Sequence, residues 1–129
     1  MNNPNISELI TAATELVTKY SDDKNHTVAA SVLTTSGKTI TSLNLYHFTG
    51  GPDAEIAALA RVVSEGEEPT LIVAVGNNNR GVLAPCGKCR QIMFDYYPEI
   101  QVIVADDGTT KTIKELLPDT YSCNDQQIS

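Results

Sequence analysis

The residues of this chain best suited to chemistry are Cys86 and Cys89, in the segment PCGKC at residues 85–89. Side chains three residues apart share one face of a helical turn, so two thiolates at this spacing can bind the same metal ion. A structural zinc site takes four protein ligands, whereas a catalytic site takes three and leaves the fourth position to water. The third cysteine, Cys123, lies in a polar segment, and the two histidines are not paired at metal-ligand spacing. The cysteine pair therefore needs a third ligand from elsewhere.

A second reactive segment, Asp53-Ala54-Glu55, lies earlier in the chain. Zinc-dependent deaminases of nucleobases carry His-x-Glu followed by Pro-Cys-x-x-Cys, in which the His or a Cys in its place binds zinc and the Glu moves protons. Here Asp53 occupies the ligand position and Glu55 the proton-shuttle position. A carboxylate oxygen binds zinc at about 2.0–2.2 Å. The sequence therefore predicts a zinc site formed by Asp53, Cys86 and Cys89, with Glu55 beside it.

Both segments are predicted at the N-termini of helices. Pro52 precedes an apolar stripe that predicts a helix ending near residue 66, and the cysteine segment opens a second helix that stops before Pro98. The positive end of a helix favours anionic ligands and lowers thiol pKa values. Asp53 and Glu55 are two residues apart and would not share a face inside a regular helix. They can converge only if Asp53 is the non-helical cap residue.

The predicted ligand set carries excess negative charge. Three anionic ligands around a zinc ion leave a net charge of about −1. Lys88 and Arg90 flank Cys89, and we predict that they offset this charge from positions next to the ligands. The alternative is that both are solvated charges on the surface of the helix.

The remaining apolar patterns predict a mixed α/β fold. A helix is expected over residues 5–20, strands over 27–33 and 38–43 joined by a hairpin, strands over 70–75 and 100–104, and a short helix over 113–117. Polar turns are expected at 77–81 and 106–108. Alternating strands and helices imply a mixed sheet with helices on both faces. We expect one domain over residues 1–129, with a core at about 5–121 and a polar tail at 122–129.

Composition excludes several classes of partner. The net charge is −7 with nine Lys and Arg residues, so no basic surface is available for a nucleic acid polymer. Residues 1–5 lack the basic and apolar regions of a signal peptide, and no apolar run approaches the roughly 20 residues of a membrane helix. Three cysteines, two of them in a C-x-x-C, suit a reducing compartment better than a disulfide framework. We therefore expect a cytoplasmic protein with no membrane partner.

Residues 44–55 (NLYHFTGGPDAE) and 76–91 (GNNNRGVLAPCGKCRQ) resemble the cytidine deaminase family and, within it, the blasticidin S deaminases. The resemblance runs from about residue 27 to residue 121. It implies a three-layer α/β/α fold, a homotetramer, a zinc cofactor and hydrolysis of a cytosine amino group to a uracil carbonyl. The resemblance also assigns Asp53, Cys86 and Cys89 to zinc, Glu55 to proton transfer, and four residues to substrate: Thr27, Asn44, Arg80 and Tyr121.

Two residues depart from the family's pattern. Asp53 stands where the family has Cys or His, and a carboxylate reduces the softness that favours zinc while leaving a stronger Lewis acid. Tyr46 stands where ordinary cytidine deaminases carry a Glu that, together with the Asn at position 44, contacts the ribose. A site without that carboxylate should select less strongly for an ordinary ribose. This difference favours a modified sugar or a broad range of cytosine nucleosides.

Three other interpretations remain open at this point. The chain could be an ordinary cytidine or deoxycytidine deaminase of pyrimidine salvage. It could be a non-catalytic nucleoside-binding relative in which Asp53 marks a decayed site. It could also be a C-x-x-C redox protein without a metal. The retained Glu55 and the proline before Cys86 argue against the last two, so we expect an enzyme acting on a small cytosine nucleoside.

Overall fold

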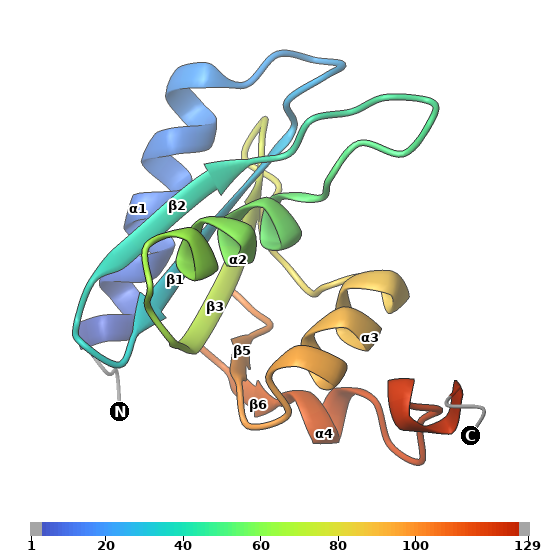
Figure 1. Cartoon of the computed structure of the whole chain (residues 1–129). Coiled ribbons are helices and arrows are strands. Elements are labelled where there is room, and N and C mark those ends of the chain that lie inside the picture. Colours follow the sequence, from blue (N-terminus) through green and yellow to red (C-terminus); the bar gives the residue numbers. More distant parts are fainter. Residues whose placement is uncertain (1–3, 127–129) are drawn as a thin grey trace.

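The computed structural model describes residues 4–126, whose centre is a six-stranded mixed sheet (Figure 1). The strand order is β2-β1-β3-β5-β6, and β4 pairs with β3. The strands are β1 Val28–Thr34, β2 Thr39–Leu43, β3 Pro69–Gly76, β4 Gly81–Leu83, β5 Gln101–Ile103 and β6 Thr110–Thr112. The helices are α1 Pro4–Tyr20, α2 Ala54–Ser64, α3 Gly87–Tyr96 and α4 Ile113–Leu116, followed by the 3₁₀ helix η1 Cys123–Gln126.

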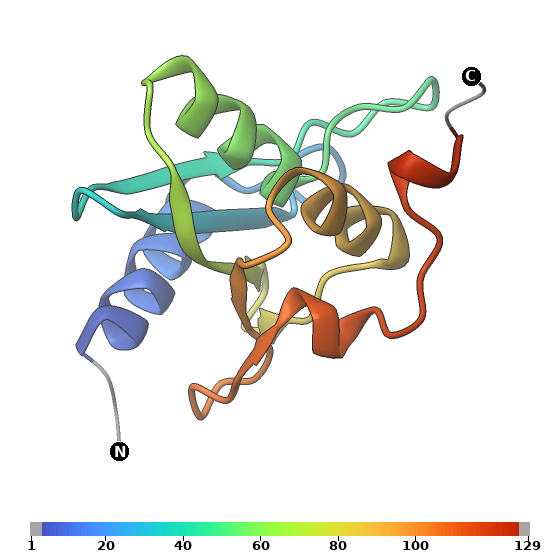
Figure 2. The same ribbon diagram turned by 60° about the horizontal axis from the view of Figure 1, so that its bottom comes forward.

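Helices cover both faces of this sheet, with α1 on one side and α2 and α3 on the other (Figure 2). The central strand β3 is buried along most of its length and pairs antiparallel with β1 and parallel with β5. Its Val73 and Val75 pack toward α1, whereas Ile72 packs toward α2 and α3. This alternation explains the near-continuous apolar run, because both faces of the strand are covered. The prediction of a three-layer α/β/α fold with a mixed sheet is confirmed.

Several elements differ from the sequence-based predictions. Strands β4 and β6 were not expected, because three-residue strands carry too little periodicity to be recognised. In the predicted turn before β4, Asn78 and Asn79 adopt positive φ angles of 55° and 60°. Part of the predicted tail over 122–129 forms η1, and residues 127–129, like residues 1–3, lie outside the described part. Within residues 4–126, no helix is long and apolar enough to cross a membrane.

The loop between β2 and α2 is closed by a close backbone approach. The Leu45 N–H donates to the Pro52 carbonyl at 3.0 Å, which brings the two ends of the loop together. A Cβ on Gly51 would lie 1.7 Å from the Leu45 carbonyl oxygen, so only glycine fits at this position. The closed loop leads directly into α2, whose cap residue is Asp53 of the predicted zinc site.

Candidate active site

The two reactive segments lie at the N-termini of α2 and α3, as predicted. Asp53 is the cap residue of α2, with φ −68° and ψ 158°, and Cys86 is the cap residue of α3, with φ −71° and ψ 171°. Within the described structure, neither side chain makes a capping hydrogen bond, so both are available to the site. Because Asp53 precedes the helical repeat, it can converge with Glu55 despite their two-residue spacing. The condition derived from the sequence is therefore met.

Asp53, Cys86 and Cys89 come together as one cluster. Their ligand atoms all lie within 4.8 Å of one another. The Cys89 thiol donates to Asp53 Oδ2 at 3.2 Å, and Cys86 Sγ lies 4.0 Å from the same oxygen. Cys89 is buried, Asp53 half-buried and Cys86 exposed. Two thiols and one carboxylate are a donor set that fits zinc, and three protein ligands leave room for a water, as in catalytic zinc sites.

Glu55 is buried beside this cluster, with 7% of its surface exposed. Burial, and then the negative charge of Asp53, raise the pKa of the Glu55 carboxyl. Burial also raises the pKa of the Cys89 thiol, and the charges of Glu55 and Asp53 add to this effect. A bound cation would act in the opposite direction, because it deprotonates a coordinating thiol.

The cluster opens into a cavity of about 170 Å³. Its lining combines the predicted polar residues with apolar side chains from β1, β3 and the segment after β4: Val28, Asn44, Asp53, Ala54, Glu55, Ala74, Leu83, Ala84, Cys86 and Cys89. Four of these lining residues, Val28, Ala74, Leu83 and Ala84, were not predicted from the sequence. Strand alternation could have indicated Val28 and Ala74, whereas the other two depend on the pairing of β4 with β3.

Comparison with known proteins now places this geometry in a family. The sequence profile of the cytidine and deoxycytidylate deaminase zinc-binding region matches residues 4–105. The chain belongs to this deaminase family. It is an aminohydrolase of the cytidine deaminase type with zinc as its cofactor, and Asp53, Cys86 and Cys89 are the described residues that could hold the ion.

Individual relatives of this deaminase agree with the family assignment. The chain is 33% identical to blasticidin-S deaminase from Bacillus cereus, over 91% of this chain and 92% of that one. It is 31% identical to cytidine deaminase from Halalkalibacterium halodurans, over 76% and 79%. A crystal structure of cytidine deaminase from Burkholderia pseudomallei, 30% identical, superposes with a TM-score of 0.72 over 94% of this chain and 100% of that chain. A mutant cytidine deaminase from Mycobacterium tuberculosis, 23% identical, shares the fold with a TM-score of 0.79, over 95% and 99%.

Asn44 is the predicted substrate residue of this deaminase that lines the cavity. Its Oδ1 accepts hydrogen bonds from the backbone N–H groups of Thr27, at 2.7 Å, and Val28, at 3.0 Å. Its Nδ2 lies 3.5 Å from the Thr27 hydroxyl. Asn44 is therefore held against the start of β1, with its amide oriented by two backbone donors.

Thr27, Arg80 and Tyr121 are not among the described residues that line the cavity. The Arg80 guanidinium donates through Nη2 to the Thr27 carbonyl at 2.7 Å and to Asn77 Oδ1 at 2.9 Å. The side chain of Tyr121 is 57% exposed, and its carbonyl accepts a hydrogen bond from Gln91 Nε2 at 2.7 Å. The predicted substrate contacts of these three residues therefore stay predictions.

Lys88 and Arg90, which were predicted to act alike, make different contacts in the deaminase. Lys88 Nζ lies 3.8 Å from Asp53 Oδ2, so its charge faces the cluster. Arg90 donates through Nε to the Pro85 carbonyl at 2.8 Å and through Nη1 to the Leu116 carbonyl at 3.0 Å. Arg90 thereby connects the segment before α3 to the end of α4.

Proposed function

We propose that this enzyme hydrolyses the amino group of a cytosine ring in a small nucleoside substrate, with Glu55 as the proton-transfer group and Asp53, Cys86 and Cys89 as the zinc ligands. The observation that carries the proposal is the buried Glu55 carboxyl, which lines the same 170 Å³ cavity as the three ligand side chains. A general base must lie within reach of the proton it moves, and a position in the cavity wall beside the cluster meets this requirement.

The reaction assigns one task to each part of the site. When bound, zinc lowers the pKa of water toward about 7 and so supplies the attacking oxygen at neutral pH. Glu55 would take one proton from the attacking water and pass it to the ring nitrogen as the oxygen adds to the ring carbon. It would then take the second proton from that added oxygen and deliver it to the amine as the C–N bond breaks. The apolar wall formed by Val28, Ala74 and Leu83 keeps the flat ring away from bulk water.

The substrate in this proposal carries a modified sugar, as in blasticidin S. Tyr46 replaces the ribose-binding carboxylate of ordinary cytidine deaminases, and its side chain is 58% exposed on the loop that precedes α2. Because Tyr46 has no carboxylate to accept hydrogen bonds from the sugar hydroxyls, the site should select less strongly for an ordinary ribose. The 33% identity to a blasticidin-S deaminase supports the same substrate class.

Ordinary cytidine or deoxycytidine is the second candidate, and the 31% identical cytidine deaminase of Halalkalibacterium halodurans supports it. The deciding experiment compares blasticidin S, cytidine, deoxycytidine and an amine-substituted cytidine by loss of cytosine absorbance and release of ammonia or amine. We expect turnover of blasticidin S or of the substituted cytidine. Exclusive use of cytidine would contradict the interpretation of Tyr46. Nucleoside binding without release of ammonia would indicate a non-catalytic relative.

The zinc ligands are tested by elemental analysis of protein purified without added metal. We expect about one zinc per chain in the wild type and little in Asp53→Ala. A metal-free wild type with reactive thiols would favour the C-x-x-C redox interpretation instead. A site that depends on free thiols needs a reducing compartment, so the proposal places the enzyme in the cytoplasm.

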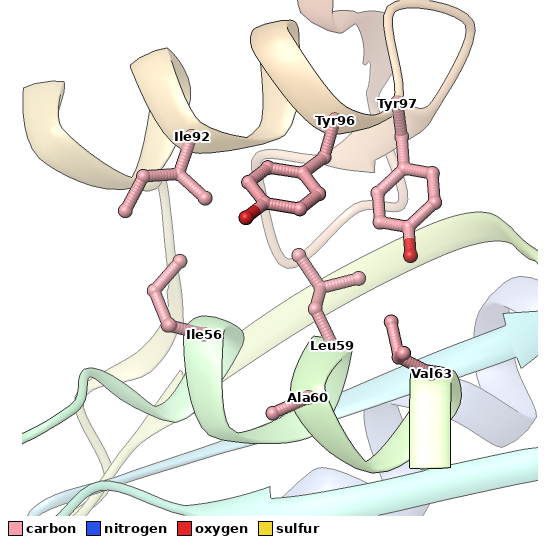
Figure 3. A pocket seen from close by; sticks show the side chains of 7 residues that line it. All are labelled: Ile56, Leu59, Ala60, Val63, Ile92, Tyr96 and Tyr97. Carbon is pink, nitrogen blue, oxygen red and sulfur yellow. The ribbon is translucent and has the colours of Figure 1, made fainter. Parts of the chain in front are cut away.

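The proposal also includes a homotetramer, and an apolar groove of about 520 Å³ between α2 and α3 supports one of its subunit interfaces (Figure 3). Ile56, Leu59 and Val63 of α2 face Ile92 and Tyr96 of α3 across the groove. Val63 is 58% and Tyr96 70% exposed. Aromatic and aliphatic side chains of this kind are enriched in the buried centres of subunit interfaces. A second copy of the chain, related by two-fold symmetry, is the occupant that we assign to this groove.

A further inference from the structure

Lys88 occupies an unusual position relative to the predicted zinc ligands. It lies between the two cysteines in the first turn of α3, where the positive end of the helix makes a cation unfavourable. Its ammonium lies 3.8 Å from Asp53 Oδ2. The same carboxylate oxygen lies 3.2 Å from Cys89 Sγ and 4.0 Å from Cys86 Sγ. One oxygen atom of Asp53 thus links the lysine to both cysteines.

The contact between Lys88 and Asp53 can offset the negative charge of the site. One carboxylate and two thiolates around a divalent ion leave an excess of one negative charge, and Glu55 adds another when it is ionised. Arg90, the other cation next to Cys89, donates to the carbonyls of Pro85 and Leu116 instead. Lys88 is therefore placed to offset the charge, and it does so through the ligand by which this chain departs from its family.

We propose that Lys88 is a positioning residue that sets the zinc affinity of this site through Asp53. It holds the carboxylate oxygen near the two sulfur atoms and offsets the charge that Asp53 adds relative to a neutral histidine ligand. The inference rests on the proposed assignment of Asp53, Cys86 and Cys89 to zinc. It makes the effect of Lys88 depend on the residue at position 53.

The test measures the dissociation constant for zinc by competition with a chromophoric chelator. We expect Lys88→Met to weaken zinc binding about tenfold to a hundredfold, as is typical when a group that contacts a metal ligand is lost. Lys88→Arg should restore most of the affinity, because it keeps the charge. Lys114→Met is the control, since the Lys114 side chain is 57% exposed, close to the 58% of Lys88, and pairs with Glu99 at 2.9 Å away from the cluster; it should leave the affinity unchanged.

A double-substitution cycle separates this role from a general loss of positive charge. In an Asp53→His background, Lys88→Met should change the zinc affinity by less than about threefold, because no carboxylate remains to be paired. The same loss of affinity in both backgrounds would overturn the inference. An unchanged affinity in Lys88→Met would also overturn it while leaving the proposed function intact. A wild type that binds no zinc would overturn both.

Ionic strength provides an independent readout should Asp53→His fail to fold. The side chains of Lys88 and Asp53 are 58% and 42% exposed, so salt screens their interaction. The difference in zinc affinity between wild type and Lys88→Met should shrink as the salt concentration rises from about 0.01 M to about 1 M. A difference that does not depend on salt would contradict the electrostatic role.

Discussion

Helices α2 and α3 present two different surfaces, a polar cluster at their N-termini and an apolar groove along their sides. Within the cluster, Asp53 has partners from the same chain, namely the Cys89 thiol and the Lys88 ammonium. In the groove, Val63 and Tyr96 keep more than half of their surface exposed. The side chains of the cluster thus come from a single chain, whereas the groove leaves apolar side chains exposed that, in our proposal, a second copy of the chain buries. Substitutions in the groove should therefore leave zinc content unchanged, and substitutions in the cluster should leave the mass of the assembly unchanged.

The largest effect is expected from Glu55→Gln. Because the amide cannot accept or deliver the transferred proton, we expect turnover to fall about 10²- to 10⁴-fold. Zinc content and the mass of the assembly should stay unchanged, as measured by elemental analysis and light scattering. Glu68→Gln, an exposed carboxylate just beyond α2, is the matched control and should keep full activity. A Glu55→Gln enzyme with wild-type turnover would remove the proposed proton-transfer role.

A negative charge placed in the apolar groove between α2 and α3 should weaken the association of subunits. Tyr96→Glu places a carboxylate where the second copy is expected to pack, and burying an unpaired charge costs several kcal/mol. We expect the mass in solution, measured by light scattering after size-exclusion chromatography, to drop below that of the wild type, with zinc content unchanged. Tyr20→Glu is the control, since Tyr20 is 56% exposed on α1, on the opposite side of the sheet. An unchanged mass for Tyr96→Glu would show that the groove is not the interface.

A smaller effect concerns the pH dependence of stability in metal-free protein. Because burial raises the pKa of Glu55 above its ordinary value of 4.5, the folded state keeps a proton that the unfolded chain has already lost. The free energy of unfolding should therefore fall as the pH rises from about 4.5 to the folded-state pKa, by up to about 1.4 kcal/mol per pH unit. Urea titration in the presence of a chelator measures this slope.

Glu55→Gln should remove that contribution, whereas Tyr96→Glu should retain it. A slope that persists in Glu55→Gln would assign the effect to other groups. If the free energy of unfolding falls with pH equally in wild type and Tyr96→Glu, the pH dependence comes from Glu55 in the cluster, and a carboxylate at position 96 in the groove adds nothing to it.

The smallest effect is expected from Arg90→Lys. A lysine keeps the charge but cannot reach the carbonyls of Pro85 and Leu116 with two separate N–H groups. We expect a loss of about 1 kcal/mol in the free energy of unfolding, the net value of one hydrogen bond, and a decrease in turnover of less than about tenfold. Thermal unfolding and steady-state kinetics measure the two quantities. A loss of zinc affinity as large as that of Lys88→Met would show that the two cations act alike after all.

Local signals in the sequence are sufficient to predict the groups that form the cluster. The three-residue spacing of Cys86 and Cys89, and Pro52 ahead of Asp53, are local signals that depend on neighbouring backbone geometry. The same holds for the long helices and for the buried strand β3, whose apolar run reflects coverage on both faces. The fold class and the position of the three clustered side chains at two helix N-termini could therefore be predicted.

The surroundings of the cluster depend on contacts between distant parts of the chain, which local signals do not specify. Lys88 and Arg90 have the same charge and flank the same cysteine, yet one faces Asp53 and the other binds two carbonyls. The short strand β4, the cavity wall at Leu83 and the groove between α2 and α3 likewise depend on contacts between residues far apart in the chain. Spacing along the sequence predicts which residues share a local face, but it does not specify which distant residues that face will contact.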